Sequence, residues 1–229
     1  GEAPEAARGL GPYILRLVAF QDRRQRGREA LILMLPESGD RPLANDRIRI
    51  GVCGFGGRGG SHIGEYLKLP NVEVSHLIDI DSSLFDRTTK RITEAGGSNP
   101  TCVQDLRQAL EDPDLDAVSI ATCNHTHSLL TIWACQAGKD VYVEKPISHN
   151  VWEGRQCVEA ASRYERVVQH GTQQRSSQGR ANEIAAIRSG NYGKLLVAKA
   201  HASKPRASLG FKDPKEVPAH IDFNLWLGP

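Results

Sequence analysis

The segment DVYVEKP contains the side chains best placed for proton chemistry. Its apolar residues predict a buried strand over residues 140–144, and Glu144, Lys145 and Pro146 stand where that strand ends. In open sheets of parallel strands, ligands bind in the crevice outside the carboxyl ends of the strands. A lysine held there and partly desolvated can have a lowered pKa and exchange a proton with a substrate. Pro146 can form a cis bond with Lys145 that would aim the amine into the crevice, although an isolated lysine at a strand end is more often a surface residue.

A second segment, GVCGFGGRGG at residues 51–60, places six glycines in ten positions. Within it, Gly54-Phe55-Gly56-Gly57-Arg58-Gly59 fits the pattern G-x-G-x-x-G between an expected strand and an expected helix. The first glycine of such a loop permits a tight turn, the second lets the backbone approach a pyrophosphate, and the third lets the helix pack closely on the strand. The phosphates would lie at the amino terminus of the helix, where free N–H groups and the helix dipole favour anions.

Asp79 strengthens the interpretation of the glycine loop. It ends the next expected strand about 20 residues beyond Gly59, where an acid that hydrogen-bonds the adenosine ribose is expected. An acid there favours NAD, because the 2′-phosphate of NADP would meet a like charge, whereas Arg58 weakens this preference because it could reach such a phosphate. Asp81 is interpreted as a solvated turn residue. A glycine string alone is as often a plain turn, but the loop together with Asp79 predicts a site for NAD or NADP, with NAD favoured.

Alternating strands and helices must position these residues. Strand-like apolar runs and helix-like periodic runs follow one another along the chain, which indicates βαβ units and a parallel sheet covered on both faces. The expected fold is therefore an α/β Rossmann fold with a doubly wound parallel sheet. The expected strands are 47–53, 72–78, 116–122, 140–144 and 166–170, and the expected helices between them are 61–69, 105–110, 128–138 and 152–164.

Composition and the pattern of apolar residues divide the sequence into three parts. Residues 1–46 are irregular and predict an N-terminal extension, and residues 47–170 predict the dinucleotide-binding domain. Residues 171–229 predict the start of a second α/β domain, with a helix over 181–194 and a strand over 195–203. One strand and a loop cannot bury a core alone, so this second domain is expected to be incomplete.

Composition excludes several classes of partner. Of the 229 residues, 39% are hydrophobic and 24% are charged, and the net charge of +2 is too small to indicate a nucleic-acid partner. No apolar run approaches the roughly 20 residues of a membrane-spanning helix, so no membrane partner is expected. The five cysteines form no CxxC pair, so neither a disulfide framework nor a metal site is expected. Reduced thiols favour a cytoplasmic location, and Arg23–Arg24 matches a twin-arginine export signal poorly because the apolar run after it is short.

The glycine loop, Asp79, the segment ATCNHTH at residues 121–127 and the EKP motif, in this order, closely resemble the Gfo/Idh/MocA oxidoreductases. The resemblance runs from about Asn45 to Pro229. It implies a Rossmann domain followed by an α/β domain on a large open sheet, with NAD or NADP as cofactor. It also implies hydride transfer at a hydroxyl-bearing carbon of a small polyol or sugar, such as a cyclitol, by a homo-oligomer. Similar bacterial members are often exported, which makes a periplasmic location of the parent protein the alternative to a cytoplasmic one.

The resemblance assigns roles to individual residues. Lys145 matches the catalytic lysine, and Glu144 and Pro146 complete its motif. Asn124 and His125 match positions that line the cofactor, with Thr122 beside them, although Asn124 is equally well interpreted as a helix cap and His127 as a packing or capping residue. The substrate or nicotinamide contacts that it suggests are His149, His170 and Gln173, with Asn150 and Gln169 beside them, and for His149 a structural hydrogen bond is an equal alternative. Trp226 resembles a residue near the active site and is equally well a core tryptophan.

Two alternatives stay open at this point. Family enzymes usually take an aspartate and a histidine from the second domain, and no counterpart can be named in this sequence. A dinucleotide-binding module without catalysis, or an inactive fragment, is therefore the first alternative. A methyltransferase is the second, but it has no use for Glu144, Lys145 and Pro146.

Overall fold

The structure is a computed structural model that describes residues 47–201, 207–208 and 210–229. The predicted extension at residues 1–46, including Arg23–Arg24, lies outside the described residues. Within the described ranges, no helix is long and apolar enough to cross a membrane.

Six parallel strands form one sheet in the order β3-β2-β1-β4-β5-β6. The chain runs outward from β1 to β3 and then crosses to the other side of β1 to form β4, so the strand order reverses between β1 and β4. At such a reversal the loops diverge and leave a crevice at the carboxyl ends of the strands. The strands are β1 (Ile48–Cys53), β2 (Val72–Ile78), β3 (Thr101–Val103), β4 (Ala117–Ile120), β5 (Asp140–Glu144) and β6 (Val168–Gly171).

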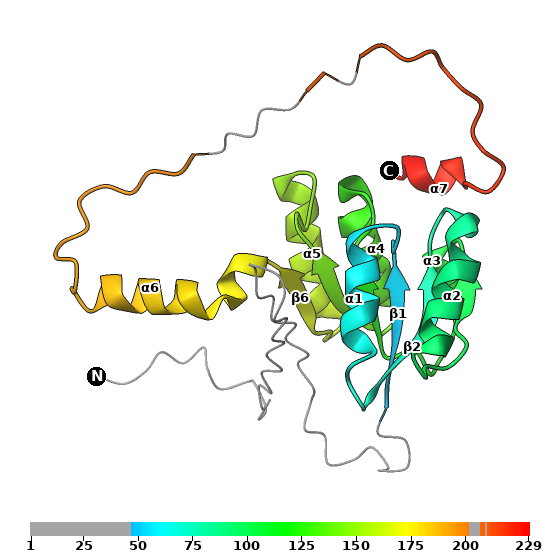
Figure 1. Cartoon of the computed structure of the whole chain (residues 1–229), viewed down its shortest axis with the longest axis horizontal. Coiled ribbons are helices and arrows are strands. Elements are labelled where there is room, and N and C mark those ends of the chain that lie inside the picture. Colours follow the sequence, from blue (N-terminus) through cyan, green and yellow to red (C-terminus); the bar gives the residue numbers. More distant parts are fainter. Residues whose placement is uncertain (1–46, 202–206, 209) are drawn as a thin grey trace.

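Helices cover both faces of the sheet, which confirms the doubly wound Rossmann fold (Figure 1). One core packs α1 (Arg58–Tyr66) and α2 (Phe85–Glu94) against β1 and β2. The other packs helices from the second half of the domain against the opposite face, and β4 is buried on both sides. These helices are α3 (Leu106–Leu110), α4 (His127–Gln136) and α5 (Val151–Arg163).

Two elements of this domain have no counterpart in the sequence prediction. In α2 the half-buried Phe85 and the buried Thr88 and Ile92 lie at helical spacing, so the pattern was present in the sequence and the prediction missed it. Strand β3 has three residues and lies at the edge of the sheet, with two of them exposed. The first helix also begins at Arg58, within the glycine string, and not at residue 61.

After β6 the chain leaves the domain through the short 3-10 helix η4 (Gln173–Ser176) and α6 (Gln178–Arg188), which has no buried residue and extends away from the sheet (Figure 1). The strand predicted at 195–203 is wrong for residues 195–201, which are exposed and have no regular secondary structure. A strand needs a neighbour to bond its backbone, and no strand in the described ranges lies beside these residues. Residues 202–203 lie outside the described ranges.

Residues 218–229, here named the returning segment, lie against the Rossmann domain and contain α7 (Phe223–Leu227). Ile221 forms an antiparallel bridge with Asp81, just beyond β2. The carbonyl of Trp226 lies 2.7 Å from Nε2 of His125, just beyond β4. The segment therefore contacts the domain on both sides of β1.

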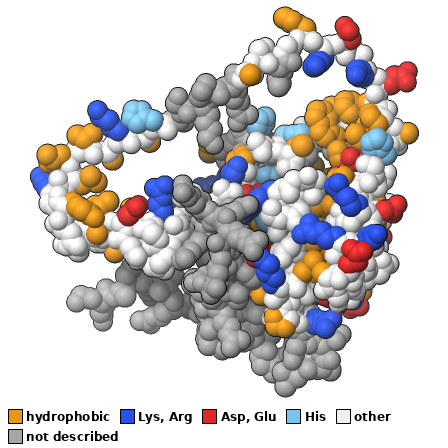
Figure 2. All heavy atoms as spheres, in the orientation of Figure 1, with side chains coloured by type: hydrophobic (Ala, Val, Ile, Leu, Met, Phe, Trp, Pro, Cys, Tyr) orange, Lys and Arg blue, Asp and Glu red, His pale blue; other side chains and the backbone are white. Residues whose placement is uncertain are grey.

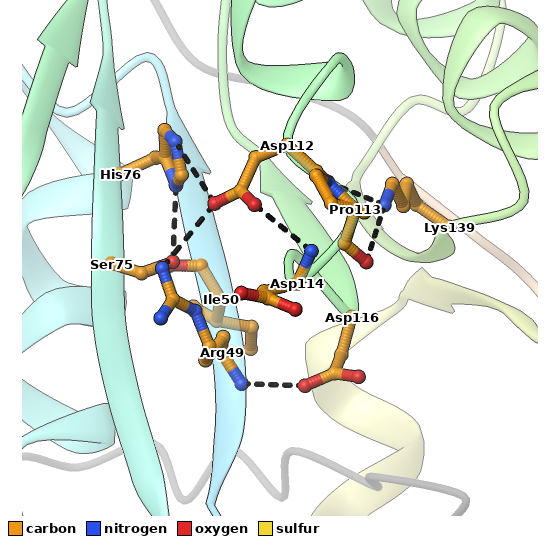
Figure 3. Close-up of polar contacts among 9 residues, drawn as sticks. All are labelled: Arg49, Ile50, Ser75, His76, Asp112, Pro113, Asp114, Asp116 and Lys139. Atoms are coloured by element: carbon orange, nitrogen blue, oxygen red, sulfur yellow. Dashed lines mark hydrogen bonds and ion pairs between the residues drawn. The ribbon is translucent and has the colours of Figure 1, made fainter.

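A polar cluster, here named the amino-end cluster, joins β1 and β2 to the loops that precede β4 and β5 (Figure 3). It consists of Arg49, His76, Asp112 and Lys139. The Asp112 carboxylate lies 3.3 Å from the Arg49 guanidinium and 3.7 Å from Nε2 of His76. The buried ammonium of Lys139 donates to the carbonyl of Asp112 at 2.7 Å. These contacts fix the loop that leads into β4.

Candidate functional site

The backbone of the glycine loop between β1 and α1 packs tightly against its own residues and against the residues that follow β4. Gly54 has φ +78°, and a Cβ at this position would lie 2.7 Å from the Thr122 backbone. A Cβ at Gly59 would overlap the carbonyl of Gly54. Side chains are excluded at both positions by backbone atoms that cannot yield, which is the close helix-to-strand packing that the sequence predicted.

The amino terminus of α1 is open toward the crevice. No side chain caps this helix, and its first turn contains no acidic residue. A Cβ at Gly57, the residue before the helix, would face open space. A helix end with free N–H groups and room beside it binds anions, so this part of the chain fits the pyrophosphate of a dinucleotide.

Asp79 lies directly after β2 and faces the glycine loop. Its carboxylate accepts hydrogen bonds from the backbone N–H of Phe55 at 2.9 Å and of Asp81 at 3.1 Å. Burial raises the pKa of the Asp79 carboxyl, and these two hydrogen bonds oppose the rise. Asp81 caps the 3-10 helix η2 (Ser82–Leu84) through Ser83, which agrees with its interpretation as a turn residue.

A cavity of about 870 Å³ lies at the carboxyl ends of β1, β2 and β4. Its volume is within the range of small-molecule and cofactor sites. The walls come from the Rossmann domain on one side and from residues 215–229 on the other. Among the predicted cofactor-binding residues, it is lined by Gly54, Gly56, Asp79 and Thr122.

Beneath the end of β5 lies a second polar cluster, here named the carboxyl-end cluster, which consists of Arg58, His62, Ser119 and Glu144. One oxygen of the buried Glu144 carboxylate lies 3.2 Å from both Nε of Arg58 and Nε2 of His62. Nδ1 of His62 lies 2.9 Å from the Ser119 hydroxyl. Burial acts to raise the pKa of Glu144, but the hydrogen bonds from His62 and Arg58 outweigh it and lower the pKa to about 2.

Lys145 follows this cluster and is exposed. Its backbone N–H donates to Glu144 at 3.1 Å, and its peptide bond to Pro146 is cis. Within the described residues, the ammonium makes no hydrogen bond or ion pair. The partial desolvation predicted for Lys145 is not found, because the chain leaves β6 through the exposed α6 and adds no cover over this end of β5.

Two predicted cofactor contacts in the loop between β4 and α4 have different surroundings. Thr122 lines the cavity, and its hydroxyl lies 2.8 Å from that of Thr126. Asn124 is exposed, and the interpretation of Asn124 as a cap is wrong, because α4 begins after Thr126 and has no side-chain cap. A contact from Asn124 to the cofactor stays a prediction.

The two histidines of this loop have different partners. His125 holds the returning segment, through Nε2 to the Trp226 carbonyl and through an edge-to-face contact with the Trp226 ring at 5.9 Å. Trp226 itself is 41% exposed, so it is not a core tryptophan. His127 is buried, with its ring nitrogens 2.6 Å from the Pro146 carbonyl and 3.1 Å from the Thr122 carbonyl, which confirms a packing role.

The residues after the EKP motif form a helix cap. Asn150 accepts a hydrogen bond from the backbone N–H of Glu153 at 3.0 Å, and Glu153 in turn accepts from the backbone N–H of His149 at 3.0 Å. Asn150 thus caps α5, and Glu153 bonds the residue before the cap, a variant of the capping box that the spacing N-x-x-E in the sequence could have predicted. This hydrogen bond is made by the backbone of His149, so the role of its exposed side chain stays a prediction.

Strand β6 places another predicted histidine, His170, next to β5. His170 pairs with Val143 in the sheet, and its Nε2 is buried without a hydrogen-bond partner in the described part of the chain. Burial lowers the pKa of His170, against the opposing charge of Glu144. Gln169 bonds the His170 carbonyl at 2.8 Å, and Gln173 begins η4 with φ +48°. Contacts from His170 and Gln173 to a substrate stay predictions.

His62 and Ser119 are the site residues that the sequence prediction missed. His62 lies on the buried face of α1 with Ile63 and Tyr66, and this helical spacing was visible in the sequence. Its pairing with Glu144 was not visible, because the two residues are 82 positions apart.

No group of three or more His, Cys, Asp or Glu among the described residues could hold a metal ion. The five cysteines all lie in described ranges and are free thiols.

Curated relatives and solved structures resemble this chain. It is 28% identical over 159 residues to a protein named "Glycosyl hydrolase family 109 protein" from Shewanella pealeana, an alignment that covers 68% of the chain and 35% of the relative. A protein of the same name from Shewanella putrefaciens is 28% identical over 180 residues, covering 77% of the chain and 38% of the relative. The chain thus spans little more than a third of the length of these relatives.

Among solved structures, GenD2 from gentamicin A biosynthesis, in complex with NAD, has 28% sequence identity and a TM-score of 0.57, with 63% of this chain and 40% of that chain covered. An NAD binding oxidoreductase from Klebsiella pneumoniae has 26% identity and a TM-score of 0.55, covering 64% and 40%. A myo-inositol 2-dehydrogenase from Lactobacillus plantarum, at 21% identity and a TM-score of 0.58 over 66% and 43%, shares the fold.

The model of one protein family matches residues 48–172, which is more than half of the chain. That family is described as an oxidoreductase family with an NAD-binding Rossmann fold. The matched range contains the glycine loop, Asp79 and the EKP motif. The chain therefore belongs to the Gfo/Idh/MocA family of oxidoreductases, and its Rossmann domain is an NAD-binding domain.

Proposed function

We propose that this chain supplies the NAD site and the proton-handling amine of an oxidoreductase that acts on a hydroxyl-bearing carbon of a sugar or cyclitol. The observation behind the proposal is the placement of three features at one edge of one sheet. The glycine loop follows β1, Asp79 follows β2 and Lys145 follows β5. NAD, when bound, supplies the hydride chemistry, and the protein positions the reactants and manages the proton.

Each residue has a defined task in this proposal. The Asp79 carboxylate accepts hydrogen bonds from ribose hydroxyls, and the free amides of α1 hold the pyrophosphate. The Lys145 amine takes the proton from the substrate hydroxyl in oxidation and returns it in reduction. Glu144 is a positioning residue, because one carboxylate oxygen is held by Arg58 and His62 while the other accepts from the Lys145 backbone.

The charge of the cavity supports NAD over NADP as the cofactor. Asp79, Asp81 and Asp105 all line it. A phosphate on the adenosine ribose would bring two further negative charges toward these carboxylates, and like charges in a partly buried site repel strongly.

The decisive experiment replaces Lys145 by Met in the protein at its full natural length. NADH formation is measured with a panel of sugars and cyclitols, and NAD⁺ affinity is measured by calorimetry. We expect kcat to fall by about 10²- to 10⁴-fold, the usual contribution of a general acid or base, with NAD⁺ affinity retained. Lys90→Met is the matched control, because Lys90 is a 75% exposed lysine on α2. Turnover near the wild-type rate would exclude this role for Lys145, and NAD⁺ binding without turnover of any substrate by the wild type would favour a binding module.

The printed name of the curated relatives supports glycoside hydrolysis as a second candidate function. The two candidates differ in their net reaction. A dehydrogenase accumulates one NADH for each substrate oxidised, whereas a hydrolase releases the aglycone without net NADH. Incubation with nitrophenyl glycosides, with nitrophenol and NADH followed together, therefore separates them.

A further inference from the structure

We infer that the returning segment forms the outer wall of the adenosine half of the NAD site. The cofactor would then be bound by the Rossmann domain and by this segment together. The inference rests on the proposed function, since it takes NAD to be the ligand of the cavity. Three observations support it: an anchor beyond β2, an anchor beyond β4, and the cavity between them.

The first anchor joins the segment to the residues that follow Asp79. The backbone N–H of Asp222 donates to the Ile80 carbonyl at 2.9 Å, and that of Ser82 donates to the His220 carbonyl at 2.9 Å. The Gln104 amide donates to the carbonyls of Ile80 at 2.7 Å and His220 at 3.3 Å. The segment thus extends the backbone pairing of the sheet just beyond the acid expected to bind the ribose.

The second anchor joins the segment to the loop after β4. The His125 ring bonds the Trp226 carbonyl at 2.7 Å. Gly228 has φ +64°, and a Cβ there would lie 3.0 Å from the Thr126 methyl group. A residue other than glycine would strain the backbone and crowd the Thr126 methyl group.

The two anchors fix how the segment crosses the domain. Strands β2 and β4 flank β1 in the sheet, so the segment spans the carboxyl end of β1, where the glycine loop begins. The cavity of about 870 Å³ lies between this span and the Rossmann domain.

The cavity has the chemistry that an adenosine requires. Ile221 and Leu225 line it from the returning segment, where they are the half-buried apolar side chains, and Ile78, Leu84 and Leu130 line it from the Rossmann domain. Apolar walls suit the two faces of a purine ring, and the carboxylate of Asp79 suits the ribose hydroxyls.

Two aromatic side chains of the segment, those of Phe223 and Trp226, also line the cavity. Phe223 and Trp226 stack on each other with ring centroids 5.4 Å apart, and both are about 40% exposed. Figure 2 shows the hydrophobic side chains that gather at α7, with a histidine beside them. The experiment replaces the half-buried Ile221 and Leu225, because neither side chain belongs to this aromatic stack.

The experiment divides the cofactor into its halves. Calorimetry of the chain uses NAD⁺, AMP as the adenosine half and nicotinamide mononucleotide as the other half, with wild type, Ile221→Ala and Leu225→Ala. We expect each variant to bind NAD⁺ and AMP about tenfold more weakly, since the lost contact equals roughly two methylene groups, and to bind the mononucleotide unchanged. Phe211→Ala is the control, because that side chain is fully exposed and contributes no lining to the cavity.

A second measurement needs no variant. Hydrogen exchange of the wild-type amides from Ile221 to Gly228 should slow when NAD⁺ or AMP is added. Unchanged exchange, or variants that bind AMP as tightly as the wild type, would overturn the inference while leaving NAD binding intact. A wild type that binds neither NAD⁺ nor AMP would overturn the proposed function as well, so the two failures are distinguishable.

Discussion

The two polar clusters lie at opposite ends of the same sheet and differ in what lies next to their buried charged groups. In the amino-end cluster, the ammonium of Lys139 is buried and its hydrogen bonds go to loop carbonyls (Figure 3). In the carboxyl-end cluster, Glu144 is buried and paired with charged or polar side chains, but the next residue, Lys145, is exposed at the carboxyl end of β5. One cluster therefore ties loops together, and the other holds a residue that faces outward.

This difference shows that a buried charge does not by itself mark a functional site. Perturbed titratable groups also occur in structural networks, and the sheet has one at each end. What distinguishes the carboxyl end is the amine of Lys145, which makes no hydrogen bond or ion pair with the described residues and lies at the end of the sheet where open α/β folds bind ligands. The predictions below test whether only this end affects NAD.

The largest effect is expected for Glu144→Leu. This change leaves the Arg58 guanidinium and the His62 ring against an apolar side chain, and breaking a buried ion pair costs about 3–5 kcal/mol. Because the Arg58 side chain is 36% exposed, we expect the free energy of unfolding in urea to fall by about 3 kcal/mol. NAD⁺ affinity should fall too, since the support of the EKP turn is lost. Glu94→Leu, at a 66% exposed side chain, is the control, and a cost for Glu144→Leu no larger than the control's would contradict the role of the cluster.

The next effect is a fall in the free energy of unfolding at low pH. The pKa of Glu144 is about 2 in the folded protein against 4.5 for the free group. Its stabilisation is therefore fully present above about pH 5 and is lost as the pH falls toward 2, with about 2 kcal/mol lost by about pH 3. Urea unfolding at about pH 6 and about pH 3 should show a fall that is smaller by this amount in Glu144→Gln than in the wild type. Equal falls in the two proteins would show that Glu144 does not titrate in this way.

The smallest effect is expected at the other end of the sheet. Lys139→Met removes the donor for the carbonyls of Asp112 and Pro113, which should lower the free energy of unfolding by about 1–2 kcal/mol. NAD⁺ affinity should stay at the wild-type value, with Lys90→Met as the exposed control. If the affinity falls as far as it does in Glu144→Leu, the distinction between the two ends fails.

The parts of the fold that could be predicted are those with a local signal. The glycine loop, the acid after β2 and the apolar runs of β1, β2 and β5 each reflect a backbone geometry or burial within a few residues. In contrast, β3 has only three residues, none of them buried, and gives no periodic pattern, whereas the helical spacing of Phe85, Thr88 and Ile92 in α2 was present and overlooked.

The parts of the site that could not be predicted depend on contacts between distant positions. His62 was visible as a buried histidine, but its partner Glu144 is 82 residues away. The returning segment resembled a loop of a second domain, because the residues that hold it, such as Gln104 and His125, lie more than 100 positions earlier. Exposure of Lys145 matches the surface lysine that the sequence offered as the alternative, but the sequence could not decide between the two, because exposure depends on which elements cover the end of β5.

The path of the chain around residues 172–217 has a consequence for how the protein can vary. The stretch starts at the end of β6. The returning segment that follows it lies at the carboxyl ends of β2, β1 and β4, where it is fixed at two points. The entropy of closing a loop grows only with the logarithm of its length, so doubling such a connection costs about 0.6 kcal/mol. Insertions of very different size can therefore be accommodated there while the returning segment keeps its two contacts with the Rossmann domain. The glycine loop and Asp79 lie earlier in the chain, so this stretch can vary in length without rebuilding the dinucleotide site.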